Sequence, residues 1–329
     1  MFRKSRSILI ALAIMLGACA PAATPMVAPT NVPAVVPTSA PTVAPTPAPQ
    51  PVPVMLTDRL GHTVTLNSVP KRIISIAPSN TELLFVVGAG DQVVGREELS
   101  DYPEAAKKIA SIGSVYGKIN TEAIVALKPD LILAAEINPP EQVKTLQDLG
   151  LTVYYLSNPT DFEGLYANIK VVGQLTGHDI EAQKSINSTK ARFDAVVTKV
   201  SVSSFMPKVY YELDATDPTK PYTTGTGTFV DLLIKLAGGQ NIGAALKDQY
   251  AQISAEEIVK QNPDVIVLGD AAYGVSIDSI GARAGWASIA AVKNKAVYAF
   301  DDNLVSRPGP RLIDGLEQLA KLLHPDLFK

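Results

Sequence analysis

Residues 116–136 read YGKINTEAIVALKPDLILAAE, and residues 250–270 read YAQISAEEIVKQNPDVIVLGD. The offset between the two stretches is a constant 134 residues without a gap, and eight of the 21 positions are identical. Chance pairing at average amino-acid usage would give roughly one or two identities. An internal repeat of this kind indicates that one structural unit occurs twice in the chain.

Each copy of the repeat carries the signals of a short helix followed by a buried strand. Asn120 and Ser254 are residue types whose side chains accept hydrogen bonds from the first free N–H groups of a helix, so both are predicted to be N-caps. Pro129 and Pro263 cannot continue a helix. The runs LILAA and VIVLG that follow are typical of strands buried on both faces. Two copies of this unit predict two similar lobes.

Strand and helix signals alternate through the remainder of residues 57–329, which predicts an α/β protein with parallel sheets covered by helices. The first buried strand is expected at 72–77, followed by a loop and cap at 78–82 in which Thr81-Glu82 opens a helix. One long helix is predicted over 179–200, because apolar residues recur there near a 3.6-residue period without proline or glycine. It lies between the two copies of the repeat.

The first 18 residues have the pattern of a secretion signal. Arg3, Lys4 and Arg6 form a positive segment, and the apolar run that follows is too short to span a bilayer. Residues 16–19, Leu-Gly-Ala-Cys, resemble a bacterial lipoprotein signal box. The resemblance implies cleavage before Cys19 and a lipid on its sulfur, and the alternative is a buried structural cysteine.

Residues 19–55 are predicted to be a linker after this cysteine. Prolines recur every fourth residue from Pro21 to Pro45, with Ala, Thr and Val between them. Such a composition buries little and favours an extended polyproline II spacer of about 3.1 Å per residue. A random disordered tail is the alternative, and the position after the lipid site favours a spacer that holds the folded part away from a membrane.

Charge and composition exclude several classes of function. Removing residues 1–18 takes away three basic residues and no acidic one, so the formal net charge falls from −3 to −6, which argues against a nucleic-acid partner. A single cysteine excludes disulfides within the chain and multi-cysteine zinc sites. The three histidines are not near a serine elbow or an HExxH pattern, and there is no P-loop, so the sequence argues against an enzyme.

The landmarks together resemble the class III substrate-binding proteins of ATP-driven importers for cobalamin, ferric siderophores or haem. They include RIISIAPSNTELLFVVGAGDQVVG at 72–95, the two repeated stretches, the long helix and SRPGPRLIDGLEQLAKLLHP at 306–325. The family fold is two Rossmann-like α/β lobes joined by one long rigid helix, with the ligand in the cleft between them. The resemblance implies an N-terminal lobe at 56–177, a linking helix at 178–202 and a C-terminal lobe at 203–329.

The resemblance also implies a partner and a way of docking. Family members deliver their ligand to an ABC permease dimer with its ATPase subunits, and one glutamate on each lobe contacts permease arginines. Those positions correspond here to Glu122 and Glu256. The alternative is that both residues only complement helix dipoles, a contribution of about 0.3–1 kcal/mol each.

For the ligand, the resemblance points to loops at the strand ends that face the cleft. The candidate residues are Pro78, Ser79, Asn80, Thr81, Tyr102, Tyr116, Tyr222, Tyr250 and Arg307. Cobalamin binders often carry tryptophan at the positions of Tyr116 and Tyr250, whereas tyrosine also offers a flat face and could ligate haem iron. Ordinary packing is the alternative role for each tyrosine. Cobalamin is the first expectation, with a ferric siderophore or haem as the alternative.

The sequence thus predicts a lipid-anchored, extracytoplasmic solute receptor. It is expected to act as a monomer without a resident cofactor or a metal site of its own. An enzyme and an adhesion module on a proline-rich stalk are the competing classes. Turnover by the purified protein would favour the enzyme, and saturable small-molecule binding would exclude the adhesion module.

Overall fold

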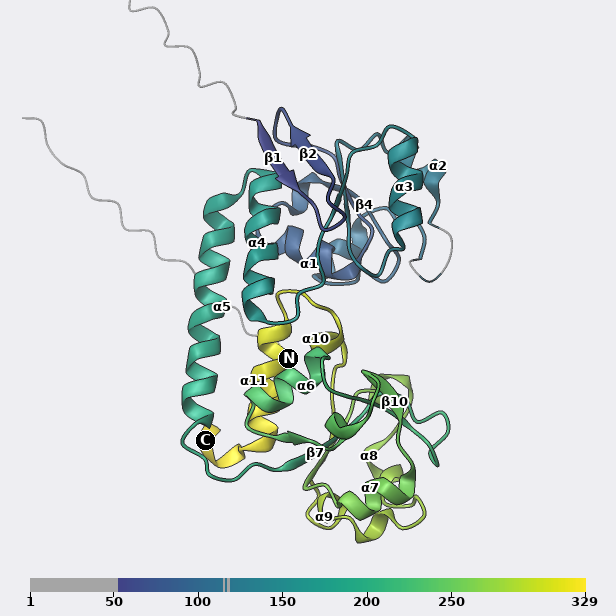
Figure 1. The fold of residues 1–329 in the computed structure, drawn as a ribbon, viewed down its shortest axis with the longest axis vertical. Coiled ribbons are helices and arrows are strands. Elements are labelled where there is room, and N and C mark those ends of the chain that lie inside the picture. Colours follow the sequence, from purple (N-terminus) through teal and green to yellow (C-terminus); the bar gives the residue numbers. More distant parts are fainter. Residues whose placement is uncertain (1–52, 115, 117–118) are drawn as a thin grey trace, which may run out of the picture. The chain divides into compact units, whose positions relative to one another are not determined.

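The computed structural model describes residues 53–114, 116 and 119–329 of the chain (Figure 1). Cys19 and the segments predicted to be a signal peptide and most of the linker lie outside the described residues. The first described element is an antiparallel hairpin of β1 (Val54–Thr57) and β2 (Thr63–Leu66).

Two four-stranded parallel sheets form the centres of two lobes. The N-terminal lobe, residues 54–176, has the strand order β4–β3–β5–β6, and the C-terminal lobe, residues 208–328, has the order β12–β11–β7–β9. Read from the other edge, the second order is β9–β7–β11–β12, which repeats the first. The strands are β3 (Ile73–Ser75), β4 (Val93–Arg96), β5 (Leu131–Ala134), β6 (Val153–Tyr155), β7 (Lys208–Glu212), β9 (Gln240–Asn241), β11 (Val265–Leu268) and β12 (Val297–Ala299). The prediction of two similar α/β lobes is confirmed.

Helices accompany the strands in the same alternation. In the N-terminal lobe they are α1 (Pro78–Val86), α2 (Thr121–Ala126), α3 (Pro140–Asp148) and α4 (Phe162–Thr176). In the C-terminal lobe they are α6 (Phe229–Leu236), α7 (Ala255–Gln261), α8 (Ile277–Ile280), α9 (Ala290–Lys293), α10 (Asn303–Ser306) and α11 (Leu312–Leu323). A short antiparallel pair, β8 (Tyr222–Thr224) and β10 (Tyr250–Gln252), was not predicted. Each of these strands has three residues, too few to show a period of two.

The two repeated stretches start their helices in the same way. The side chain of Asn120 accepts a hydrogen bond from the N–H of Ala123 at 2.9 Å, and the side chain of Ser254 accepts one from Glu257 at 3.1 Å. Both predicted N-caps are therefore confirmed. Glu122 and Glu256 occupy the second position of α2 and α7, and both are exposed.

The ends of the repeated helices match as well. Lys128 and Asn262, 134 residues apart, both adopt a left-handed backbone conformation, with φ of 46° and 48°. Two residues later, the Asp130 carboxylate accepts the N–H of Arg72 at 3.0 Å, and the Asp264 carboxylate accepts the N–H of Lys208 at 2.8 Å. Each aspartate thereby fixes the repeated strand against the first strand of its own sheet.

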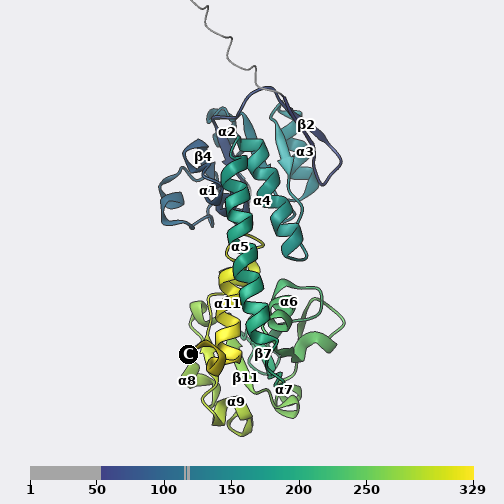
Figure 2. The ribbon, with the colours of Figure 1, turned by 90° about the vertical axis from the view of Figure 1, so that its left-hand side faces the viewer.

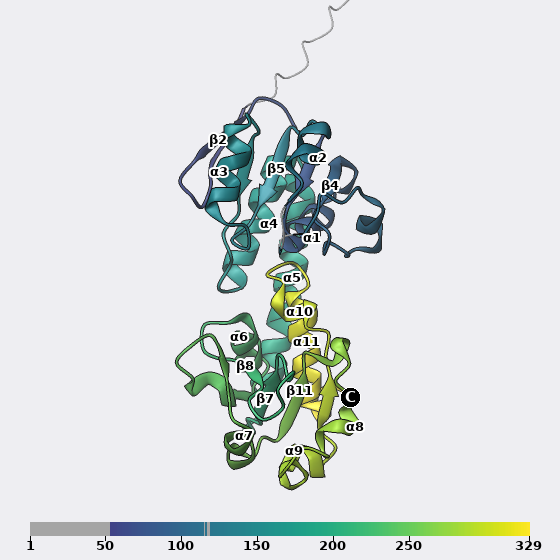
Figure 3. The same cartoon turned by 90° about the vertical axis from the view of Figure 1, so that its right-hand side faces the viewer.

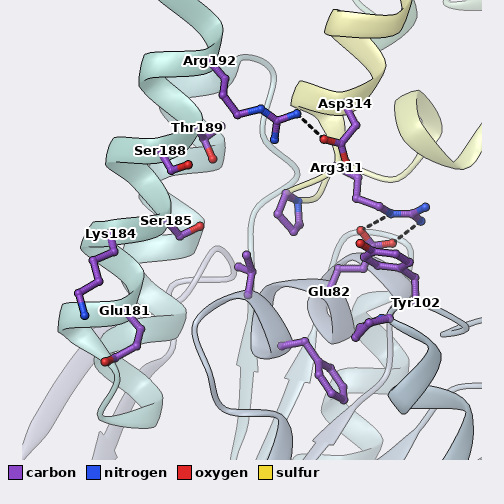
Figure 4. A pocket seen from close by; sticks show the side chains of 14 residues that line it. Glu82, Tyr102, Glu181, Lys184, Ser185, Ser188, Thr189, Arg192, Arg311 and Asp314 are labelled. Atoms are coloured by element: carbon purple, nitrogen blue, oxygen red, sulfur yellow. Dashed lines mark hydrogen bonds and ion pairs between the residues drawn. The ribbon is translucent and has the colours of Figure 1, made fainter.

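The long helix α5 (Asp179–Val200) spans the predicted range and packs against α4 and α11 (Figures 1 and 2). One hydrophobic cluster contains residues from both sheets. It also includes Phe162 on α4, Val196 on α5 and Leu316 on α11, so it joins the linking helix to both lobes. Arg192 of α5 also pairs with Asp314 of α11 at 2.6 Å (Figure 4). A helix without proline or glycine that is packed along its length resists bending.

The predicted start of the helix after β3 is wrong. Helix α1 begins at Pro78 rather than at Thr81, because proline at the first helical position lacks only an N–H that would be unpaired there and its fixed φ suits a helix. Thr81 is instead buried inside the helix, and its hydroxyl is bonded to the hydroxyls of Ser75 at 2.8 Å and Ser100 at 2.7 Å. Among the described residues, no helix combines the length and apolar character needed to cross a bilayer.

Candidate functional site

A cavity of about 570 Å³ lies between the lobes at the carboxyl ends of the strands. Its lining includes Pro78 and Ser79 after β3, Glu136 after β5, Asn158 after β6 and Asp302 after β12. In open α/β sheets, ligands bind in the crevice outside the carboxyl ends of the strands. Both sheets direct that edge into this cavity, so it is the candidate site.

A second cavity of about 260 Å³ extends the first. It shares Glu136, Asn158 and Asp302 with the larger cavity and adds Gly227 and Tyr250. We call the two together the cleft. Helix α10 lies between the lobes in this region (Figures 1 and 3), and its Ser306 lines both cavities.

Exposed aromatic rings line the cleft. Tyr273 is 88% exposed, Tyr116 is 80% exposed and Tyr250 is 58% exposed. Leu99 and Ile137 add exposed apolar surface to the larger cavity. A tyrosine combines a flat apolar face with a polar tip. Exposed apolar side chains collected in a concave site indicate a sizeable, partly apolar ligand.

An ion-pair network joins the lobes at one wall of the cleft. Arg307, which follows α10, lies 2.6 Å from Asp101 and 3.6 Å from Glu82, both in the N-terminal lobe. Burial alone would raise the pKa of the Asp101 carboxyl, but the hydrogen bond and positive charge of Arg307 outweigh it and lower that pKa. Asp101 therefore holds its negative charge against Arg307.

The deepest member of this network is Glu82 on α1, whose side chain is 1% exposed. Arg311 binds it with two hydrogen bonds of 2.7 and 3.0 Å, and the Tyr102 ring lies 4.2 Å from the Arg311 guanidinium carbon (Figure 4). Burial raises the pKa of the Glu82 carboxyl, and the hydrogen bonds and charges of Arg311 and Arg307 offset part of that rise. The two arginines thus neutralise a carboxylate at the junction of the lobes.

Behind this network is a separate hollow of about 630 Å³, lined by α1, the polar side of α5 and residues 310–314 (Figure 4). Tyr102 and Arg311 lie in its wall, whereas neither lines the cleft. The hollow is not at the carboxyl ends of the strands. We therefore assign the candidate site to the cleft rather than to this hollow.

A buried polar cluster lies at the end of β7 in the C-terminal lobe. Arg283 binds the fully buried Glu212 with two hydrogen bonds, one of them 2.8 Å. Burial raises the pKa of the Asp270 carboxyl to about 6, and the negative charge of Glu212 is the second contribution to this rise. One carboxylate oxygen of Asp270 accepts the N–H of Ala215 at 3.0 Å, and the other is buried without a hydrogen-bond partner in the described part of the chain.

The structure brings together five of the nine predicted ligand residues. Pro78, Ser79, Tyr116, Tyr250 and Arg307 line the cleft, and their role in binding stays a prediction.

The other four lie elsewhere. Asn80 and Thr81 are at most 1% exposed, so their side chains lie beneath the surface of the cleft. Tyr102 lines the rear hollow, and Tyr222 lies on β8 opposite Gln252 without lining any of the described cavities.

The sequence reasoning missed several residues of the cleft, among them Glu136, Asn158, Tyr273 and Asp302. Glu136, Asn158 and Asp302 come two or three residues after the ends of β5, β6 and β12. Residues that follow every predicted parallel strand share one edge of a sheet, so extending the search to all strands would have found these three. Tyr273 lies farther from β11, in a short turn without a periodic signal.

The comparisons with known proteins agree with this geometry. The family model for periplasmic binding proteins matches residues 73–304. The chain belongs to the periplasmic binding protein family. Membership makes it an extracytoplasmic substrate-binding protein of the kind that serves ABC transporters, and it confirms the resemblance found in the sequence.

Three relatives illustrate the range of this family. The chain is 35% identical over 279 residues to an uncharacterized ABC transporter substrate-binding lipoprotein of Bacillus subtilis, covering 84% of this chain and 87% of the relative. It is 30% identical to the periplasmic vitamin B12 binding protein of Vibrio cholerae, with a TM-score of 0.66 over 79% of this chain and 98% of that one. It is 26% identical to a periplasmic heme-binding protein from Roseiflexus, with a TM-score of 0.70 over 78% and 99%.

Proposed function

We propose that this binding protein captures cobalamin or a related corrinoid in the cleft and delivers it to an ABC permease. The observation that carries the proposal is the cleft itself, which lies at the carboxyl ends of both sheets and is lined by the exposed rings of Tyr116, Tyr250 and Tyr273. Flat apolar faces beside polar groups suit a large macrocycle with polar substituents. The similarity to a vitamin B12 binding protein supports this ligand class.

Haem or a ferric siderophore is the second candidate. The similarity to a heme-binding protein supports haem, and a tyrosine could ligate its iron. In the described residues no group of three or more His, Cys, Asp or Glu side chains could hold a metal ion. We therefore propose that any metal arrives as part of the ligand and that the protein has no resident cofactor.

Absorbance of the purified protein decides between these ligands. The protein is mixed with cyanocobalamin, haemin or a ferric siderophore and then desalted. A retained corrin spectrum supports the proposal, and a retained Soret or siderophore charge-transfer band supports the second candidate. A desalted protein that retains none of the three ligands would contradict both the corrinoid proposal and the second candidate. We also propose that the protein is a carrier and not an enzyme. Chemical conversion of a bound ligand by the purified protein would contradict this.

Docking to the permease is proposed to use Glu122 and Glu256. Both are exposed, and both begin helices that lead into β5 and β11. A helix that precedes a parallel strand starts at the edge where the strands end, which is the edge that carries the cleft. A permease dimer could therefore contact one glutamate on each lobe while facing the cleft, with its ATPase subunits behind it.

The remaining elements of the proposal concern location and state. We propose that lipid on Cys19 anchors the protein to the cell membrane, which the similarity to a Bacillus subtilis lipoprotein supports. We also propose that the protein acts as a monomer, because one chain supplies both walls of the cleft.

A further inference from the structure

Helix α1 points an uncapped N-terminus at the cleft. It has nine residues, its N-cap Ala77 offers no side-chain acceptor, and its first turn contains no acidic residue. The backbone N–H groups of Ser79 and Asn80 donate to no acceptor within the described part of the chain. Unpaired N–H groups at the start of a helix, together with the helix dipole, attract an anion.

The Ser79 side chain is a second, independent sign of a ligand. Ser79 is 7% exposed, and the exposed part lines the cleft. Its hydroxyl makes no hydrogen bond to any described residue, and it is not fully enclosed by the protein, so it can bond to a ligand in the cleft. One residue on, the Nδ2 amide of Asn80 is also buried without a partner in the described chain.

Arg307 supplies positive charge to the same cavity. It lines the cleft beside Ser79, and its contacts with Asp101 and Glu82 both use Nη1. The Nε and Nη2 groups have no acceptor in the described residues, so they remain available to a ligand. A guanidinium presents five donors in a fixed fork that suits carboxylate and phosphate groups.

The carboxylates near this end of the cleft are already engaged. Arg311 and Arg307 neutralise Glu82, which lies one turn into α1. On the other walls, Glu136 faces Arg59 at 3.6 Å, and Asp302 accepts a hydrogen bond from Tyr211 at 2.6 Å. The unpaired N–H groups at the start of α1 and the free donors of Arg307 are therefore the part of the cleft that offers hydrogen bonds to an anion.

We propose that the first turn of α1 and Arg307 form an anion subsite, which binds a phosphate or carboxylate group on the edge of the ligand. The inference rests on the proposed function, because it assigns one part of the same cleft. In a corrinoid the group is the phosphodiester of the nucleotide arm, and in haem it is a propionate. Backbone N–H groups, the Ser79 hydroxyl and the free donors of Arg307 would bind its oxygens.

The test compares ligands with and without the anionic group. Cyanocobalamin is paired with dicyanocobinamide, which lacks the nucleotide arm and its phosphate, and haemin is paired with its dimethyl ester. Affinities of the full chain and of the Ser79→Asp variant are measured by titration calorimetry. An aspartate at the second position suits a helix start, so the fold is expected to be kept, while its charge repels the ligand anion.

We expect Ser79→Asp to weaken cyanocobalamin at least tenfold and to change dicyanocobinamide less than threefold. The matched control is Asn158→Asp, an isosteric change that adds the same charge to another wall of the cleft. It is expected to change both affinities equally. Equal weakening of both corrinoids by Ser79→Asp, or no weakening, would overturn the subsite while leaving the corrinoid assignment intact.

The haem pair keeps the test informative if no corrinoid binds. In that case the proposed ligand is wrong, and selective loss of haemin over its dimethyl ester in Ser79→Asp still supports the subsite. If neither pair binds, inorganic phosphate is titrated while the amide signals of Ser79 and Asn80 are followed by nuclear magnetic resonance. Saturable shifts that disappear in Ser79→Asp support the subsite, and their absence overturns it.

Discussion

Replacing Arg311 by methionine would remove the main partner of a carboxylate buried between the lobes. Glu82 is 1% exposed and receives two hydrogen bonds from Arg311, whereas Arg307 lies 3.6 Å away. Breaking a buried ion pair from one side typically costs about 3–5 kcal/mol, because the remaining charge stays uncompensated. Since Arg307 still compensates part of the charge, we expect Arg311→Met to lower the free energy of unfolding by about 2–3 kcal/mol at pH 8.

The loss should depend on pH. Burial already raises the pKa of Glu82, and removal of Arg311 raises it further. A carboxyl whose folded pKa lies above its unfolded value of about 4.3 loses stability as the pH rises toward the folded pKa. The difference between Arg311→Met and the native protein is therefore expected to be larger at pH 8 than at pH 5.

Urea unfolding followed by circular dichroism measures these differences. The control is Lys144→Met, which breaks an exposed pair with Asp148 and should change stability by less than about 1 kcal/mol. In the double variant Glu82→Leu with Arg311→Met, no charge is left unpaired, so stability should recover to within about 1–2 kcal/mol of the native protein. The reasoning is refuted if Arg311→Met costs no more than Lys144→Met at pH 8.

Three further outcomes are expected. The folded pKa of Asp270 is about 6 and the unfolded value is about 3.9, so stability falls as pH rises between them. Asp270→Asn should therefore raise the free energy of unfolding by about 1–3 kcal/mol at pH 8 and by about half as much at pH 5. Urea titrations at both pH values check this, and an equal effect at both would contradict it. Glu122→Arg and Glu256→Arg should each impair ligand uptake by cells, and more so together, while affinity in the isolated protein stays within about tenfold; normal uptake in the double variant would leave these residues as helix-start residues only. Cys19→Ser should abolish incorporation of labelled lipid and release the protein from membranes, so unchanged partitioning would disprove the anchor.

The fold could be predicted from the sequence because its local signals agree with one another. The repeated stretches contain a cap, a helix-ending proline and a buried strand in fixed order, and each signal has a short-range physical cause. The same reasoning failed at α1, where Ser79, Asn80 and Thr81 are all typical capping residues. Pro78 fixed the helix start before them, and the Thr81 hydroxyl found partners in the core.

The site could be predicted only in part, because several of its contacts join residues far apart in the chain. Arg311 meets Glu82 across 229 positions, and local sequence patterns carry no information on such a pair. Tyr102 was placed correctly at a strand-end turn, yet its ring stacks on Arg311 and lines the rear hollow instead of the cleft. The turn determines the position of the Tyr102 backbone. The ring lies against the Arg311 guanidinium, which Glu82 holds in place, and it therefore faces the rear hollow.

The two lobes differ where the ligand is expected and agree where the permease is expected. Helices α1 and α6 follow the corresponding strands β3 and β7. The start of α6 is closed, because the Thr228 side chain accepts the N–H of Asp231 at 3.1 Å and Asp231 adds a negative charge there. The start of α1 lacks both features and opens into the cleft.

By contrast, the starts of α2 and α7 are both capped by a side chain, and each carries an exposed glutamate at its second position, Glu122 or Glu256. A permease dimer presents two equivalent surfaces, so equal docking residues on the two lobes suit it. A ligand held between the lobes is a single asymmetric molecule, and its anionic group needs one open helix start rather than two. The start of α1 lacks the side-chain cap and the acidic residue that close the start of α6, and an anion subsite on one wall of the cleft requires this difference.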